Sequence, residues 1–452
     1  MNQAIPLTVA VLLALGLSAC VGENMESEPV RQSEEKAMDQ DNHEGVMVGK
    51  GNRDPDPQVD EASRTALVAD NRDFAFVLFD QLREIDPEAN LFLSPYSISM
   101  ALAMVYAGAR EETRGQIAQV MNFGLDDEKL HPAFNWLDQA LAARADHDPE
   151  EEGKAFELAM VNQTWGQTDF NFQREYLDQL VKHYGAMIRL VDFENEFESI
   201  RREINAWVEE QTNDRIEDLL PPDSLNAETR FVLVNAIYFL ASWKNAFEED
   251  DTADAPFVSI DGSEVNVPMM RQTENLGLYQ GNETVAVSMP YVGEEVSLVA
   301  LMPDDAGADF RQWEAQMDRE SFDHAVAGLR PGRVSLHFPR FETDSEIALS
   351  EQLENLGMSH AFDECLADFS GISGSPPCIP GESIYIDEVF HKSFINVNEA
   401  GTEAAAATAV VMMETTAMRP PPTEIRFDRP FLYAIYDHPT ETILFLGRML
   451  KP

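Results

Sequence analysis

The chain has 452 residues, 44% of them hydrophobic, three Cys, and a formal net charge of −49 from 81 Asp and Glu against 32 Lys and Arg. This apolar content allows a large core. The acid excess excludes nucleic acid, heparin-like polyanions and anionic lipid head groups, because each of these partners needs a basic patch. So few Cys exclude a disulfide-built scaffold and a four-thiolate zinc site.

The N-terminus carries an apolar run of fifteen residues, 5–19. A bilayer span needs about 20 residues, so the run is too short to cross a membrane and is typical of a secretory signal. It ends in Leu17-Ser18-Ala19-Cys20, which resembles the lipobox of bacterial lipoproteins. The resemblance implies removal of residues 1–19 as a signal peptide. It also implies a lipid on Cys20 that anchors the exported protein to a bacterial membrane, on its periplasmic or cell-surface side. The alternative is a plain signal peptide followed by an unrelated Cys.

The segment after the signal differs sharply from the rest of the chain. Residues 21–65 carry twelve acids and five bases, and the first aromatic residue of the chain is Phe74. Such a segment cannot bury enough apolar surface to offset the entropy lost on ordering. We therefore predict that residues 20–65 hold the lipidated Cys and a disordered acidic linker. Residues 66–452 contain no comparable linker or internal repeat and are predicted to form one domain.

Within that domain, helices are predicted early and strands later. Ser94-Pro95 is typical of a helix N-cap followed by Pro at the first helical position, and the apolar residues among 98–109 have the spacing of a buried helical stripe. Residues 231–239 contain a single polar residue, which predicts a strand covered on both faces. Alternation over residues 334–338 predicts a half-buried strand, and residues 391–397 predict another. The order of these elements indicates an α+β domain.

Catalytic motifs are absent from the sequence. It contains no Gly-x-Ser-x-Gly, no His-Glu-x-x-His, no Cys-x-x-Cys and no phosphate-cradling Gly-rich loop. The nine His are scattered, and none is paired at helical spacing with another metal ligand. We therefore expect no enzyme activity, no metal site and no cofactor.

The most informative segment, residues 398–413, follows the last of these predicted strands. Its four consecutive Ala favour a helix, whereas Val410 and Val411 favour a strand. As a strand, it would place the even-numbered residues of 402–412 on one uncharged face and Glu403 on the other. The uncharged face could enter a core without burying a charge. The alternative is an Ala-rich helical connector.

This segment resembles the hinge and reactive-centre loop of a serpin, and further serpin motifs run in family order from residue 70 to the C-terminus. They lie at residues 90–99, 108–113, 204–208 with Thr212, 235–239 with Trp243, 267–270, 338–341, 367–372, 391–394 and 429–431. Together with the lipobox, they identify the chain as a member of the serpin (serine protease inhibitor) family of the bacterial lipoprotein kind.

The resemblance implies an α+β serpin fold over residues 66–452. In this fold, helices pack around a large central mixed sheet plus smaller sheets, with an exposed C-terminal reactive-centre loop. It also implies a monomeric suicide-substrate inhibitor of serine, or sometimes cysteine, proteases. The target forms a covalent complex, and the cut loop then enters the central sheet as a strand. The alternative is a non-inhibitory serpin-fold binding or structural lipoprotein. The absence of a bulky, charged or Pro-containing stretch at residues 402–410 favours the inhibitor.

The resemblance also assigns roles to single residues. The loop base and hinge comprise Glu399, Gly401, Thr402, Glu403, Ala404, Ala405, Ala406 and Ala407. The polar cluster under the opening sheet, called the shutter, comprises Ser94, Ser97, Asn235 and His391. Trp243 lies near the top of the sheet, at the breach where insertion begins. The alternative for His391 and Trp243 is an ordinary place in the core.

The resemblance leaves the scissile bond open. Counting the family's usual hinge length forward from Glu399 reaches Thr415-Thr416, whereas counting back from the C-terminal motif reaches Arg419. Pro420 follows Arg419, and a Pro on the leaving side lacks the N–H and resists attack. We therefore expect the cut after Thr415, which suits elastase- or subtilisin-like proteases, whereas Arg419 would suit a trypsin-like one. The neighbouring alternatives are Met413, Met418 and Arg419.

Two Cys remain once Cys20 is lipidated. Export would place Cys365 and Cys378 in a compartment where thiols are oxidised, so we predict a disulfide between them. The alternative is a pair of buried thiols.

Overall fold

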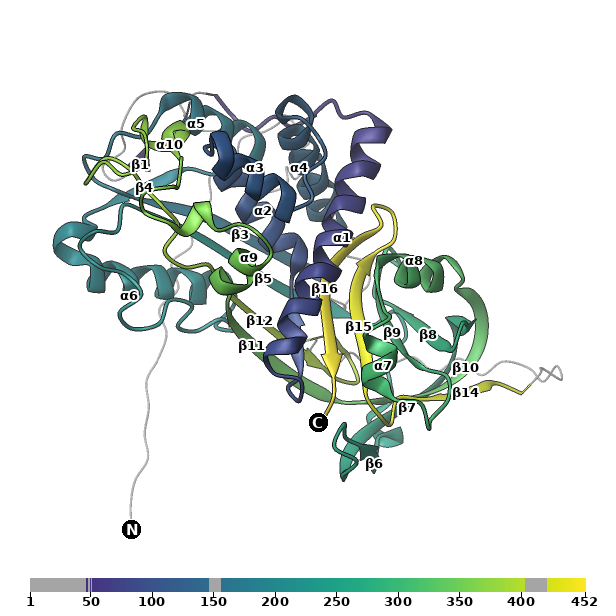
Figure 1. The fold of residues 1–452 in the computed structure, drawn as a ribbon. Helices are drawn as coiled ribbons and strands as arrows, with labels where there is room; N and C mark the ends of the chain where they lie inside the picture. Colours follow the sequence, from purple (N-terminus) through teal and green to yellow (C-terminus); the bar gives the residue numbers. More distant parts are fainter. Residues whose placement is uncertain (1–45, 48, 50, 146–155, 403–420) are drawn as a thin grey trace, which may run out of the picture. The chain divides into compact units, whose positions relative to one another are not determined.

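The computed structural model describes residues 46, 47, 49, 51–145, 156–402 and 421–452, except the side chains of 47, 145, 159–162 and 235–236. These residues form two large β-sheets with helices packed on them (Figure 1). Figure 1 also shows that helices dominate the first part of the chain and strands the later part, as predicted for an α+β domain.

Several helices begin at residues whose side chains cap them. Ser94 accepts a hydrogen bond from the Ser97 N–H and is followed by Pro95, which is the cap and first position that the sequence predicted. Asp60 caps the first helix in the same way, by accepting from the Ser63 N–H. The longer helices are α1 (Glu61–Ile85), α2 (Pro95–Tyr106), α3 (Glu111–Val120), α4 (Asp127–Ala142), α6 (Phe193–Gln211) and α8 (Arg319–Ala327). The shorter ones are η1 (Ala143–Ala145), α5 (Arg174–Gln179), η2 (Leu180–Tyr184), η3 (Glu249–Asp251), α7 (Phe310–Glu314), α9 (Ser350–Asn355), η4 (His360–Phe362) and α10 (Ser370–Ser373).

The sheet that matters for function is seven-stranded and is called the central sheet below. Its order is β1 (Val46–Met47), β4 (Ile188–Val191), β3 (Phe156–Gln167), β5 (Phe231–Ser242), β13 (Gly401–Thr402), β12 (Phe390–Val397) and β11 (Phe341–Ala348). β3 and β4 are parallel and the other pairs are antiparallel, so the sheet is mixed. β5 and β12 contain the two strands that the sequence predicted at 231–239 and 391–397.

The second sheet has nine strands and contains the predicted strand 334–338 within β10. Its order is β14 (Thr423–Arg426), β10 (Arg330–Pro339), β7 (Glu264–Gly281), β8 (Thr284–Pro290), β9 (Val296–Pro303), β15 (Phe431–Asp437), β16 (Thr442–Met449) and β2 (Leu91–Leu93), with β6 (Ala253–Val258) also paired to β7. One edge of this sheet, β2, leads directly into α2.

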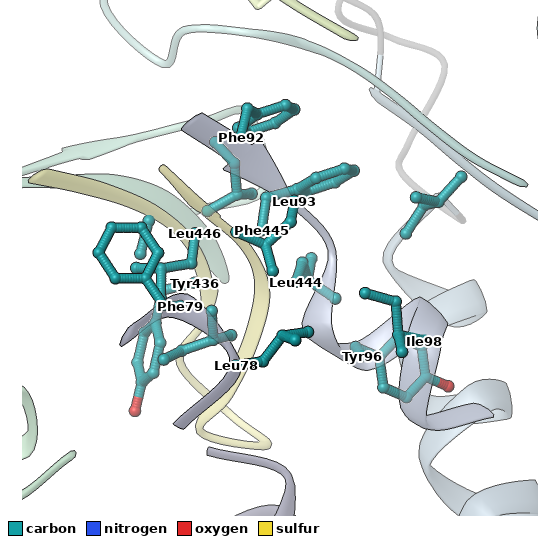
Figure 2. Close-up of a cluster of buried hydrophobic side chains, with 14 of the residues drawn as sticks. Leu78, Phe79, Phe92, Leu93, Tyr96, Ile98, Tyr436, Leu444, Phe445 and Leu446 are labelled. Atoms are coloured by element: carbon teal, nitrogen blue, oxygen red, sulfur yellow. The ribbon is translucent and has the colours of Figure 1, made fainter. Parts of the chain in front are cut away.

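The strand β5 separates two apolar cores. Val234 belongs to a smaller core beneath α6, whereas Ile237 and Phe239 belong to the larger core. Because successive strand residues point to opposite faces, these cores lie on opposite faces of the central sheet. Figure 2 shows part of the larger core, where side chains of β2 and β16 meet those of α1 and α2. Phe92 and Phe445 stack there with ring centroids 4.9 Å apart, and truncating such a residue to Ala costs about 3–5 kcal/mol.

The disordered linker predicted over residues 20–65 is wrong at its C-terminal end. β1 pairs with β4 at the edge of the central sheet, and α1 already begins at Glu61. The connecting segment is held by polar contacts with α4: Arg53 Nε donates to Asn135 Oδ1 at 2.7 Å, and Asn135 Nδ2 donates to the Asp54 carbonyl at 2.8 Å. The expectation failed because it considered only apolar burial, whereas backbone and polar side chains order this segment.

The predicted signal peptide, Cys20 and the first part of the linker lie outside the described residues. Among the residues that the structure does describe, no helix combines the length and apolar character that crossing a membrane requires.

Candidate functional site

The predicted loop hinge enters the central sheet between two long strands. Gly401 lies opposite Ser242 of β5, and Thr402 lies opposite both Ala241 of β5 and Val397 of β12. Within the described residues, β5 and β12 share no ladder of their own and are joined through β13. The first two residues of the hinge therefore already act as a strand in the position that an inserted loop would continue.

A tight turn at Asn398 brings the hinge into this position. The Asn398 side-chain carbonyl accepts from the Ala400 N–H at 2.9 Å and from the Gly401 N–H at 3.2 Å. Its backbone N–H donates to the Gly401 carbonyl at 2.9 Å. A Cβ atom at position 401 would lie 2.1 Å from the Ala241 carbonyl oxygen. Only glycine therefore lets the chain approach β5 this closely.

Thr402 is fixed by a residue that the sequence analysis did not single out, Tyr291. Their hydroxyl oxygens lie 2.7 Å apart and share a hydrogen bond, and both side chains are buried. Burial raises the pKa of Tyr291 well above its ordinary value, so the phenol stays neutral. No sequence signal could have linked these residues, because 111 positions separate them.

Trp243, which the resemblance assigned to the breach, follows the last residue of β5 and lies beside the turn at Asn398. Its ring stacks on Tyr291 with centroids 4.5 Å apart and planes inclined by 8°. Its indole N–H donates to the Asn398 carbonyl and its backbone N–H to the Ala400 carbonyl, both at 2.9 Å. Trp243 therefore combines a place in the core with direct bonds to the turn that carries the loop.

Glu399 is held at the base of the loop. Its Oε1 accepts a hydrogen bond from Thr252 Oγ1 at 2.8 Å, and its carbonyl accepts from the Phe247 N–H at 2.9 Å. The Arg340 guanidinium lies 3.7 Å from the same carboxylate but is half exposed, so this ion pair contributes little. The neutral donors fix the loop base more than the charge does.

The shutter residues meet beneath the central sheet, where α2 begins. His391 Nε2 accepts a hydrogen bond from the Ser94 backbone N–H at 3.1 Å. Ser94 Oγ donates to the Leu444 carbonyl at 2.7 Å and accepts from the N–H of buried Ser97 at 3.2 Å. The cluster thus joins β12, the start of α2 and β16.

Burial lowers the pKa of His391 to about 4. The imidazole is therefore neutral at physiological pH. Since Nε2 accepts from a backbone N–H, the ring proton lies on Nδ1.

Two serines that the sequence analysis missed complete the shutter. The Phe92 N–H donates to Ser345 Oγ of β11 at 3.0 Å, and Ser393 Oγ of β12 donates to the Phe92 carbonyl at 2.6 Å. The backbone of Phe92 in β2 is thus satisfied by side chains on the side away from β16. The sequence could have identified Ser393, because it lies on the same inward face of the predicted strand 391–397 as His391.

Some predicted site residues lie outside the description. Asn235 is in β5 opposite Asn162 of β3, but its side chain is not described. The hinge and cleavage residues outside the described part are Glu403, Ala404, Ala405, Ala406, Ala407, Met413, Thr415, Thr416, Met418 and Arg419.

Cys365 and Cys378 are joined by a disulfide in the structure. It closes the segment that contains α10, away from the hinge. Among the described residues, no cluster of three or more His, Cys, Asp or Glu could hold a metal ion.

Comparisons with known proteins agree with this geometry. The family model described as serpin (serine protease inhibitor) matches residues 69–452. An uncharacterized serpin-like protein of Thermococcus kodakarensis is 37% identical over 380 residues, which cover 84% of each chain. The leukocyte elastase inhibitor of Homo sapiens is 36% identical over 393 residues, covering 85% of this chain and 99% of the relative.

Solved structures resemble the fold at similar coverage. The thermophilic serpin tengpin in its native state has a TM-score of 0.76 at 28% identity, over 89% of this chain and 97% of tengpin. Uncleaved ovalbumin has a TM-score of 0.72 at 27% identity, over 86% of this chain and all of ovalbumin.

Proposed function

The chain belongs to the serpin family, and on that basis we propose that it inhibits serine proteases, or cysteine proteases as some serpins do, as a suicide substrate. It has the α+β serpin fold that the resemblance implied, with helices around a large mixed central sheet. Serpins are protease inhibitors rather than enzymes, although some are non-inhibitory. The family therefore agrees with a chain that performs no catalysis of its own.

The observation that carries the proposal is the position of β13 between β5 and β12. In the proposed mechanism, the protease nucleophile attacks the scissile carbonyl of the exposed loop and forms an acyl-enzyme. The hinge side of the cut loop then extends β13 along both neighbouring strands and drags the protease with it. The gain comes from new ladder hydrogen bonds and apolar burial in a sheet that lacks this strand before cleavage.

The register supports the length of loop that must enter. Thr402 lies opposite Ala241, so ten residues further along both strands Met412 would come opposite Phe231, the first residue of β5. Even-numbered loop residues would share the buried face of Thr402, and 404–412 include none with a charge at those positions. A cut after Thr415 lies just beyond this length, so the whole β5 ladder could form before the acyl-enzyme bond is reached.

We propose an elastase- or subtilisin-like target, because Thr415 offers a small uncharged side chain. Relatives described as leukocyte elastase inhibitors support the same class. The test is to incubate the mature chain with elastase-, subtilisin- and trypsin-like proteases and to separate the products by denaturing electrophoresis. A complex that survives denaturation with the first two proteases is expected. Cleavage without any such complex would overturn inhibition and favour the non-inhibitory alternative.

We further propose that Cys20 carries a lipid and anchors a monomeric inhibitor to a bacterial membrane, on its periplasmic or cell-surface side. The support is the apolar run at 5–19 that ends in the lipobox. Replacing Cys20 with Ala should move the protein from the membrane fraction to the soluble fraction. Unchanged membrane association would contradict the anchor.

A further inference from the structure

A cavity of about 170 Å³ lies at the end of the central sheet that is farthest from the hinge. Its walls come from the start of β5, the segment that leads into β12, helix α2 and the segment after α6. The wall residues that matter here are Leu102, Val105, Leu225, Phe231, Leu233 and Phe390. The cavity is thus mainly apolar and lies between the two strands that would part on loop insertion.

One polar group in this wall has no partner. Ser224 lines the cavity, and its buried Oγ makes no hydrogen bond within the described residues. A buried hydroxyl without a partner is costly, and a ligand that supplied one would remove that cost. The site therefore favours a ligand that carries a hydrogen-bonding group.

Four charged residues line the cavity: Glu228, Arg230, Asp387 and Glu388. Glu228 and Asp387 are exposed, so water screens their charge and they attract a cation only weakly. The other two are engaged. Arg230 donates through Nη1 to the carbonyls of Ala227 and Thr229, at 2.9 and 3.0 Å. Glu388 Oε1 accepts from the N–H groups of Ser350 and Val389, at 3.1 and 2.9 Å. No cation in this wall is left to attract an anion, and the chain's net charge of −49 disfavours one further. The ligand should be neutral.

The size of the cavity suits a single ring. An apolar cavity of about 150 Å³, engineered in another protein, stays dry and binds benzene. At about 170 Å³, this cavity has room for one six-membered ring with a small substituent.

We propose that this cavity is a binding site for a neutral single-ring molecule with one hydroxyl, and that its occupation opposes loop insertion. The second part rests on the proposed function. On the register above, Val410 and Met412 would come opposite Leu233 and Phe231, and both of these β5 residues line the cavity. A bound ring takes space that these loop side chains would need, so it would turn the inhibitor toward a cleaved substrate.

Binding is tested on the intact mature chain by calorimetric titration with p-cresol and with toluene, which differ in one hydroxyl. We expect saturable p-cresol binding with a Kd of about 1 mM or below, and weaker toluene binding. Ser224→Ala should weaken p-cresol about 5-fold and leave toluene unchanged. No saturable binding of p-cresol, or an equal effect of S224A on both probes, would overturn the site.

A cavity-filling variant provides the second test. Ala101 of α2 is buried and lines the cavity, so Ala101→Met should remove binding of both probes. Ala62→Met at an exposed position of α1 is the matched control and should bind as the parent does. Undiminished binding to A101M, with an unchanged far-UV circular dichroism spectrum, would place the ligand elsewhere and overturn the proposal.

The coupling to insertion is tested on the chain after its loop has been cut. The cut form should lose p-cresol binding, and p-cresol should raise the share of cleaved inhibitor over covalent complex. Equal binding to intact and cut forms would overturn the coupling. A chain that binds p-cresol but never forms a covalent complex would instead refute the proposed inhibitory function and leave the site standing.

Discussion

The hydroxyl group of Tyr291 lies 2.7 Å from that of Thr402, the second residue of the short strand β13 between β5 and β12. Both side chains are at most 1% exposed, and Trp243 stacks on the same Tyr291 ring while its indole holds the turn at Asn398. The hinge thus starts from one defined position in the sheet. Tyr291, which belongs to neither β5 nor β12, fixes that position.

Removing either hydroxyl of this pair should destabilise the intact chain. Tyr291→Phe leaves the Thr402 hydroxyl buried without its partner, and Thr402→Val does the same to the Tyr291 phenol, at a cost of about 1–3 kcal/mol each. The double variant should cost less than the sum, because it leaves no unpaired hydroxyl. Denaturant unfolding of the four proteins measures the coupling. Additive effects would show that the hydrogen bond is not formed.

Local patterns were enough to predict several elements around this site. Ser94-Pro95 predicted the start of α2, and the unbroken apolar run at 231–239 predicted β5, because capping and periodicity act over a few residues. The roles of Glu399, Trp243 and His391 came from family resemblance. In the structure Glu399 accepts a hydrogen bond from Thr252, Trp243 donates to the Asn398 carbonyl, and His391 accepts from the Ser94 N–H.

The remaining features depend on tertiary contacts that local patterns do not encode. Tyr291 reaches Thr402 from a distant part of the chain, and Ser345 meets Phe92 across 253 positions. Residues 46–60 were predicted as linker because their composition is polar, yet polar bonds to α4 and a short strand order much of that segment.

Cutting the loop should raise the thermal midpoint by tens of degrees. The intact chain is proposed to be trapped above its most stable state, and completing the strand after β13 would release that energy. The gain should exceed the effect of about 1 kcal/mol that is usual for single substitutions. Differential scanning calorimetry before and after limited proteolysis measures it. Identical midpoints would contradict insertion.

Two Arg substitutions, one on each face of the strand that would insert, provide matched variants for the calorimetry of the cut chain. Thr402→Arg would bury a guanidinium against the larger core, so the cut chain should gain little and the inhibitor should behave as a substrate. Glu403→Arg changes the opposite face of the same strand and should keep both the gain in midpoint and the covalent complex.

Acid should weaken the shutter through His391. Burial lowers the pKa of this imidazole from 6.5 to about 4, so between these values the unfolded chain binds a proton that the folded chain does not. Stability from this group is therefore complete above about pH 6.5 and is lost as the pH falls toward 4, by roughly 3 kcal/mol for the full shift. His391→Gln keeps an acceptor for the Ser94 N–H but cannot titrate.

The measurement is the midpoint of denaturant unfolding for both proteins between pH 7 and pH 4. His131 and His183 have pKa values lowered to about 4 in the same way and titrate in this window, so the difference between parent and H391Q isolates His391. The parent should lose more stability than the variant. Parallel pH profiles would contradict a buried neutral His391.

The disulfide between Cys365 and Cys378 should form in the oxidising compartment to which the proposed export would deliver the chain. Thiol titration of the unfolded, unreduced mature chain should then find no free thiol, and the Cys365→Ser, Cys378→Ser double variant should be less stable. A closed loop of this length contributes up to about 3 kcal/mol. Two titratable thiols in the mature chain would contradict the bridge.

The scissile bond should lie after Thr415. The hinge has a fixed register, with Thr402 opposite Ala241, so the strand that enters is full length when Met412 reaches Phe231. A cut after Thr415 leaves three residues beyond that point for the acyl-enzyme link, whereas a cut after Arg419 would leave seven. A cut after Arg419 would also place Pro420 on the leaving side, where the missing N–H resists attack.

Mass spectrometry of the C-terminal peptide released from a denatured complex identifies the bond. We expect a peptide that begins at Thr416, and Thr415→Arg should shift inhibition toward trypsin-like proteases, while Met418→Arg, beyond the cut, should not. A peptide that begins at Pro420, together with stable trypsin complexes of the unmodified chain, would assign the bond to Arg419 instead.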